Sequence, residues 1–183
     1  KRLSKVKRRR NVQRNLRKNN NFKTVALIGY TNAGKTLLFN KLTKKKQSSR
    51  SRLFETLDTK ISRVYLGENI YIGLIDTVGF INNIPTSLIE SFKATLEEVN
   101  TADILLNIVD INDLNAKQKI RATKNILKDT GVDKNKISEM ITIYNKIDLK
   151  EFKSSHHYKK NYISALTGEG VSDLKRTLKN SLI

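Results

Sequence analysis

A glycine-rich segment between an apolar run and a helical stretch constrains the fold more than any other feature of the sequence. Residues 29–36 read GYTNAGKT, which has the form G-x-x-x-x-G-K-[ST]. The segment follows the apolar run 24–29, an expected strand, and opens the stretch 35–45, an expected helix. Glycines let successive backbone N–H groups face an anion, and the helix N-terminus adds a favourable dipole. The segment therefore predicts a phosphate-binding P-loop.

The residues of this loop are the first candidate site. The ammonium of Lys35 should reach the β- and γ-phosphates of a nucleotide, and the hydroxyl of Thr36 should bind Mg²⁺. A glycine turn with a surface lysine is the alternative, which the flanking strand and helix disfavour. The residues expected at the nucleotide phosphates are Gly29, Tyr30, Thr31, Asn32, Ala33, Gly34, Lys35 and Thr36.

The rest of the chain alternates short apolar runs with helical stretches, a pattern typical of a mostly parallel sheet covered by helices. Only Glu68 and Asn69 separate the second and third apolar runs, so these two runs should form an antiparallel hairpin at one edge. We predict an α/β fold of the P-loop NTPase type, with six strands and helices on both faces of the sheet. The predicted strands are 24–29, 61–67, 70–76, 104–110, 140–145 and 161–164, and the predicted helices are 35–45, 86–99, 114–129 and 171–181.

The segment Asn145-Lys146-Ile147-Asp148 indicates which base the site reads. It follows a predicted buried strand, where the Asp148 carboxylate can accept hydrogen bonds from N1–H and the 2-amino group of guanine. Adenine offers neither donor, so it would leave a buried carboxylate unpaired. Lys146 should lie along the base and Asn145 should brace the loop. The segment therefore predicts GTP or GDP as the ligand.

Two further segments complete the predicted nucleotide site. Asp76-Thr77-Val78-Gly79 has the form D-x-x-G at the end of a predicted strand, where Asp76 can hold Mg²⁺ directly or through water. The N–H of Gly79 would face the γ-phosphate. Ser164 and Ala165 follow the last predicted strand, and the Ala165 N–H would reach guanine O6. Glu97 and Glu98 are consecutive and point in different directions, so we interpret them as surface residues or partner contacts rather than a catalytic pair.

Charge is concentrated at the start of the chain. The net charge is +19, and residues 1–23 hold eleven Lys or Arg and no acid, which leaves +8 for residues 24–183. We predict two regions, a basic helical tail or linker at 1–21 from an upstream domain and a nucleotide-binding domain at 22–183. Polyanions such as RNA are natural partners of the tail, although some of this charge can be solvated surface. The sequence contains no apolar run long enough to span a membrane and no cysteine.

With these motifs in this order, the chain resembles a translation-factor-class GTPase, in particular the HflX family. The resemblance covers most of residues 23–183 and is carried by the segments 25–43, 53–58 and 74–99 and by the NKID sequence. It implies a G domain that hydrolyses GTP, binds the large ribosomal subunit and takes part in ribosome splitting or stress response, in the cytoplasm or an organellar matrix. The alternative is an RNA-binding module gated by GTP, with negligible turnover.

The resemblance also implies three roles in hydrolysis. Thr56 would be the switch threonine that meets Mg²⁺ and the γ-phosphate and, with Lys35 and Gly79, would complete the catalytic set. This chain has TLDTKI where the family usually has TLDPTT, so Thr59 is a second candidate. Asn32 matches an asparagine of potassium-stimulated GTPases, or else it stabilises the loop. Phe80 stands where Ras-like proteins carry a water-positioning glutamine, so we expect slow hydrolysis without a partner.

Overall fold

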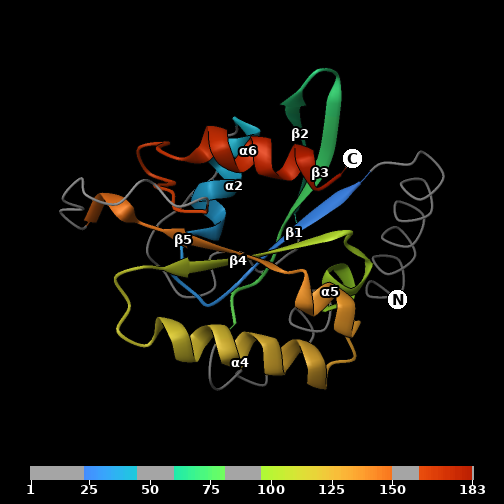
Figure 1. Cartoon of the computed structure of the whole chain (residues 1–183), viewed down its shortest axis with the longest axis vertical. Coiled ribbons are helices and arrows are strands. Elements are labelled where there is room, and N and C mark those ends of the chain that lie inside the picture. Colours follow the sequence, from blue (N-terminus) through green and yellow to red (C-terminus); the bar gives the residue numbers. More distant parts are fainter. Residues whose placement is uncertain (1–22, 45–59, 81–95, 150–160, 183) are drawn as a thin grey trace, which may run out of the picture.

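The computed structural model describes residues 23–44, 60–80, 96–149 and 161–182, and Figure 1 shows their arrangement. These residues contain a five-stranded sheet in the order β2-β3-β1-β4-β5. The strands are β1 Thr24–Ile28, β2 Lys60–Gly67, β3 Ile70–Asp76, β4 Ile104–Asp110 and β5 Ile141–Asn145. Every neighbouring pair is parallel except β2 and β3, which form the predicted antiparallel hairpin at one edge.

Helices cover both faces of the sheet, as predicted. On one face, α2 Lys35–Thr43 and α6 Val171–Asn180 pack onto alternate residues of β1 and β4, with Phe39 and Leu174 fully or almost fully buried. On the other face lie α4 Ala116–Asp129, which was predicted, and the short α5 Lys134–Ser138, which was not. Strand β1 is buried along its whole length, between helices on the two faces of the sheet. The loop that follows β1 therefore starts from a fixed position.

Two predicted elements differ from the structure. The run 161–164 is not a strand among the described residues, because its pairing is limited to one isolated bridge between Tyr144 and Tyr162. The sheet described here therefore has five strands instead of six. The helix predicted at 86–99 is described only from residue 96, and it continues to residue 101. Its Glu98 is 3% exposed, so the interpretation of this residue as surface is wrong.

The predicted tail, residues 1–21, lies outside the described residues. Across the described part of the chain, no helix is both long enough and apolar enough to cross a membrane. The carboxyl ends of the four parallel strands point to one edge of the sheet, where the P-loop follows β1, the D-x-x-G segment follows β3 and the NKID segment follows β5. The sheet thus brings together residues that are more than one hundred positions apart.

Candidate functional site

The backbone of the P-loop has a conformation that glycine permits. Gly29 and Gly34 have φ of 132° and 95°, values that L side chains rarely adopt. A Cβ on Gly29 would lie 2.3 Å from the carbonyl oxygen of Ile108, and one on Gly34 would lie 2.2 Å from Nδ2 of Asn145. Both glycines are therefore required by contacts with β4 and β5, as well as by the turn itself.

Lys35 lies inside the loop. Its side chain is buried, and its Nζ donates to the carbonyl oxygens of Gly29 at 3.1 Å and Tyr30 at 2.8 Å. Burial lowers the pKa of the Lys35 ammonium from 10.5 to about 8, while the nearby Asp76 carboxylate opposes the shift. The lysine is thus held against the loop backbone in a position where an anion can take over its hydrogen bonds.

This pKa predicts a pH dependence of nucleotide binding. Below pH 8 the Lys35 ammonium is already charged and can pair with phosphate, whereas above pH 8 binding must take up a proton. We expect the affinity for GDP to fall by about fivefold between pH 8 and pH 9 because of this uptake. Titration with a fluorescent GDP analogue measures the change. A Lys35→Ala variant should lose this slope, and an equal slope in the variant would contradict the assignment.

Two of the three residues predicted to hold Mg²⁺, Thr36 and Asp76, lie side by side. The hydroxyl of Thr36 donates to Oδ2 of Asp76 at 2.9 Å, and Asp76 is fully buried at the end of β3. A hydroxyl and a carboxylate are oxygen donors that suit Mg²⁺ when phosphates and water supply its other ligands. The described residues contain no cluster of three or more His, Cys, Asp or Glu side chains. The donor set therefore fits a magnesium ion bound together with a nucleotide.

Gly79 and Phe80 close the site from the side of β3. A Cβ on Gly79 would lie 2.9 Å from Nζ of Lys35 and 2.8 Å from Cγ2 of Thr31, so the Gly79 backbone approaches the lysine, and its contact with the γ-phosphate stays a prediction. Phe80 exchanges backbone hydrogen bonds with the P-loop, from its N–H to Gly29 O and from the Thr31 N–H to its own carbonyl, both at 3.0 Å. Its ring is fully buried, so it packs in the core and cannot position water.

Asn145 joins the base-reading segment to the P-loop, which agrees with its predicted bracing role. Its Nδ2 donates to the carbonyl oxygen of Ala33 at 2.9 Å, and its Oδ1 accepts from the N–H of Ala165 at 2.9 Å. The side chain is 1% exposed. One buried amide thus connects three of the predicted nucleotide-binding segments.

Asp148 is exposed, so the expectation of a buried carboxylate is wrong. Its carboxylate accepts a short hydrogen bond from the hydroxyl of Ser164. Ser164 thereby contacts the residue predicted to read guanine, a contact that fixes one carboxylate oxygen. The Ala165 N–H donates to Asn145, so a hydrogen bond to guanine O6 requires that this donor be shared or exchanged. That role of Ala165 stays a prediction.

Sequence reasoning missed a brace on Lys146. The Lys146 Nζ lies 2.8 Å from Oδ2 of Asp110, and the Lys146 carbonyl accepts from Nδ2 of Asn112 at 3.0 Å. The N–H of Asn112 in turn donates to Oδ1 of Asp110 at 2.9 Å. Partial burial raises the pKa of the Asp110 carboxyl, but the hydrogen bonds that it accepts from Lys146 and Asn112 and the charge of Lys146 hold this pKa below its ordinary value. The only signal in the sequence was the position of Asp110 at the end of the predicted strand 104–110, and the structure then places it beside Asn145 in the sheet register.

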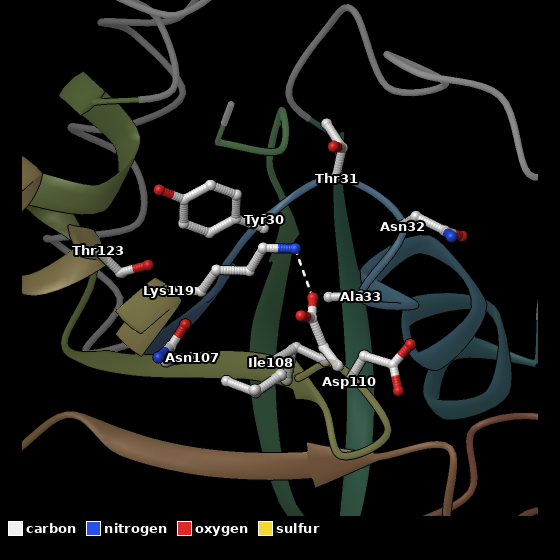
Figure 2. A pocket seen from close by; sticks show the side chains of 11 residues that line it. Tyr30, Thr31, Asn32, Ala33, Asn107, Ile108, Asp110, Lys119 and Thr123 are labelled. Carbon is white, nitrogen blue, oxygen red and sulfur yellow. Dashed lines mark hydrogen bonds and ion pairs between the residues drawn. The ribbon is translucent and has the colours of Figure 1, made fainter. Parts of the chain in front are cut away.

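A pocket of about 110 Å³ lies along the P-loop, between β4 and α4 (Figure 2). On its α4 side, Lys119 pairs with Asp113 and its Nζ lies 5.4 Å from the centre of the Tyr30 ring. Asn32 lies at the opposite end of the lining and its side chain points away from Lys119. Asn32 is exposed, has φ of 61°, and makes no side-chain hydrogen bond with a described residue. The predicted switch threonines, Thr56 and Thr59, lie outside the described residues.

Comparison with known proteins agrees with this geometry. A family profile described as 50S ribosome-binding GTPase matches residues 24–146. Curated relatives called GTPase HflX are 39% identical in Caldanaerobacter subterraneus and 35% identical in Escherichia coli, over 98% and 99% of this chain. This chain belongs to the HflX family of GTPases. It spans 41% and 43% of the lengths of these two HflX relatives.

Solved structures show the same fold as this HflX-family domain. The complex of a protein called SsGBP with GDP is 25% identical, with a TM-score of 0.66 over 88% of this chain and 50% of that one. A variant of SsGBP gives a TM-score of 0.68 over 91% of this chain and 57% of the other. The predicted P-loop NTPase G domain is therefore confirmed, apart from the strand count.

Proposed function

We propose that this HflX-family domain binds GTP with Mg²⁺ and hydrolyses it to GDP and phosphate while it contacts the large ribosomal subunit. The observation that carries the proposal is the joining of the P-loop and the base-reading segment by Asn145, beside Lys35, Thr36 and Asp76. The SsGBP relative is described as bound to GDP, and the matching family is described as 50S ribosome-binding. We place the protein in the cytoplasm or an organellar matrix.

Water attacks the γ-phosphorus in line with the bond between this phosphorus and the β–γ bridging oxygen. That bond breaks, and the bridging oxygen leaves as part of GDP. The Lys35 ammonium stabilises negative charge on the β- and γ-phosphates, and the Gly79 N–H donates to the γ-phosphate. Thr36 and Asp76 hold Mg²⁺, which neutralises phosphate charge when it is bound. Thr56, or Thr59 in its place, orders around the γ-phosphate. Phe80, whose ring is buried, follows the D-x-x-G segment where a glutamine would position water. The isolated domain therefore hydrolyses GTP slowly.

The ribosomal part of the proposal is tested by phosphate release in potassium buffer with and without purified large ribosomal subunits. We expect the subunits to increase the rate at least tenfold, because a partner must order the water that Phe80 cannot position. Equal rates with and without subunits would refute the ribosomal partner and leave GTP binding intact. GTP-sensitive RNA binding without phosphate release, even at saturating subunits, would favour the gated RNA-binding module instead.

We also propose that the Asn32 side-chain oxygen binds a potassium ion beside the phosphates. Its side chain is exposed, is not engaged by a described residue, and points away from the α4 side of the pocket. A cation there can stabilise the charge that an arginine supplies in other GTPases. The competing explanation is conformational, because Asn tolerates the left-handed backbone at φ of 61°.

The Asn32→Gly variant separates the two explanations, because glycine keeps the left-handed backbone and removes the oxygen. If Asn32 binds potassium, wild type should hydrolyse GTP about tenfold faster in potassium than in sodium, and the variant should lose this difference. Phosphate release under single-turnover conditions measures both rates. A variant that keeps the full potassium effect would show that the asparagine serves only the loop conformation.

A further inference from the structure

The β2–β3 hairpin presents one buried and one exposed face. Val64, Leu66 and Ile72 face the core formed with α2 and α6. Alternate residues must then point the other way, and Arg63 and Tyr65 on β2 are exposed. Tyr65 pairs with Tyr71 of β3 in the strand register. Figure 1 shows the far end of this hairpin extending beyond the other strands of the sheet.

These three exposed side chains, Arg63, Tyr65 and Tyr71, form one cluster, here called the hairpin patch. Tyr65 is 50% exposed and Tyr71 is 37% exposed, and they are the aromatic members of the exposed large apolar side chains among the described residues. Their ring centres are 5.0 Å apart with planes tilted by 46°, so neither ring covers the face of the other. The Arg63 guanidinium carbon lies 3.7 Å from the centre of the Tyr71 ring. The patch is therefore an exposed aromatic and cationic cluster in which the Arg63 guanidinium stacks on Tyr71 and the Tyr65 ring is tilted beside them.

The charge of the hairpin patch is positive. Arg63 makes no ion pair with a described residue, so its guanidinium donors stay available to a ligand while it stacks on Tyr71. Glu68, at the turn of the hairpin, is already paired with Lys179 of α6. The chain as a whole carries +19. A polyanion meets an attractive field here, whereas a basic partner would be repelled.

We propose that the hairpin patch binds RNA by stacking unpaired bases on Tyr65 and on the Arg63–Tyr71 stack, while the N–H donors of Arg63 contact a neighbouring phosphate. Stacking on tyrosine rings and arginine planes, combined with positive charge, is the chemistry by which proteins hold single-stranded RNA segments and loops. A pair of cross-strand tyrosines also stabilises a hairpin, but that role does not require half of a ring to be exposed. The proposal rests on the proposed ribosomal function only in naming rRNA as the natural source of such RNA.

The test uses the whole 183-residue chain and a fluorescent twelve-nucleotide oligouridine as probe. We expect the double variant Tyr65→Ala/Tyr71→Ala to bind the oligonucleotide at least tenfold more weakly than wild type, since each stacked base contributes substantially to affinity. The double variant with Phe at both positions should bind like wild type because it keeps the rings. An RNA affinity unchanged by the alanine variant, or lost equally in the phenylalanine variant, would overturn the proposal.

Two controls keep the result specific. Arg63→Ala should weaken oligouridine binding and reduce its salt dependence, whereas Arg176→Ala, which removes an exposed arginine paired with Asp173 on α6, should change neither. Unchanged melting temperature and GDP affinity show that the variants remain folded. Crosslinking with 4-thiouridine in the oligonucleotide should modify the peptide that contains Tyr65 or Tyr71. Crosslinks confined to residues 1–23 would assign RNA binding to the basic tail and overturn the proposal.

The outcome is independent of the GTPase proposal. If large subunits stimulate wild type and the alanine variant equally, and both bind oligouridine equally, the hairpin patch is not an RNA site while the GTPase proposal stands. If no variant hydrolyses GTP but only the alanine variant loses RNA affinity, the GTPase proposal fails and the patch stands. A chain that loses thermal stability, but not RNA affinity, in the alanine variant would assign the two tyrosines to the stability of the hairpin and overturn their RNA role.

Discussion

Replacing Asp148 by Asn should weaken GTP binding by roughly 10³-fold and make xanthosine triphosphate the preferred ligand. The carboxylate can accept from both donors of guanine, whereas the asparagine amide presents one acceptor and one donor. Guanine then faces the amide donor with its own 2-amino group, so the two donors oppose each other and neither is paired. Xanthine has a carbonyl at this position and restores the match. The Ser164 hydroxyl still finds an oxygen on residue 148, so the loop should keep its shape.

Competition of GTP, xanthosine triphosphate and ATP against a fluorescent GDP analogue measures this change in wild type and variant. Asp173→Asn is the matched control, because Asp173 lies on α6 in an exposed pair with Arg176. It should leave all three affinities unchanged. An Asp148→Asn variant that still prefers GTP over xanthosine triphosphate would mean that another group reads the base.

Replacing Lys35 by Ala should reduce single-turnover GTP hydrolysis by about 10²- to 10³-fold, the size of effect found when one charge-stabilising donor is removed from a reaction centre. The lysine lies within the loop, bound to the carbonyl oxygens of Gly29 and Tyr30, and adjoins Gly79. No other described lysine or arginine lies inside the loop to replace its charge. Nucleotide affinity should fall as well, because the phosphates lose their cation.

Quench-flow measurement of phosphate release from bound GTP gives the rate without the contribution of binding. Lys124→Ala, which removes an exposed lysine from α4, is the matched control and should hydrolyse GTP like wild type. Loss of Lys35 also relieves the cost of burying an ammonium, so the variant should remain folded. A Lys35→Ala rate within threefold of wild type would contradict the assignment of this lysine to the phosphates.

Local motifs made much of this site predictable. The glycine spacing of the P-loop fixes its own backbone, so Gly29, Gly34 and Lys35 could be assigned before the fold was known. The two-residue connection at Glu68 and Asn69 likewise required a hairpin, and both residues adopt the left-handed conformation of a tight turn. These features depend on residues close together in the chain, which is why the sequence predicts them.

Features that depend on distant parts of the chain were missed. The contact between Asp110 and Lys146 exists because β4 pairs with β5 in a particular register, which apolar spacing alone does not define. The sixth strand was expected from the apolar run 161–164, but one bridge to Tyr144 is all the pairing that the described residues give it. Glu98 is buried because its helix packs Leu96 and Val99 into the core. Two consecutive acidic residues in the sequence do not reveal which of them this packing covers.

The central claim is that this domain is built to bind and hydrolyse GTP. The most direct test is phosphate release from GTP and from ATP by the wild-type chain, at equal concentrations in a buffer with Mg²⁺ and potassium. We expect slow but measurable release from GTP, at least a hundredfold faster than from ATP, because adenine offers no donor to the Asp148 carboxylate. Equal release from the two nucleotides, or release from ATP alone, would contradict this claim.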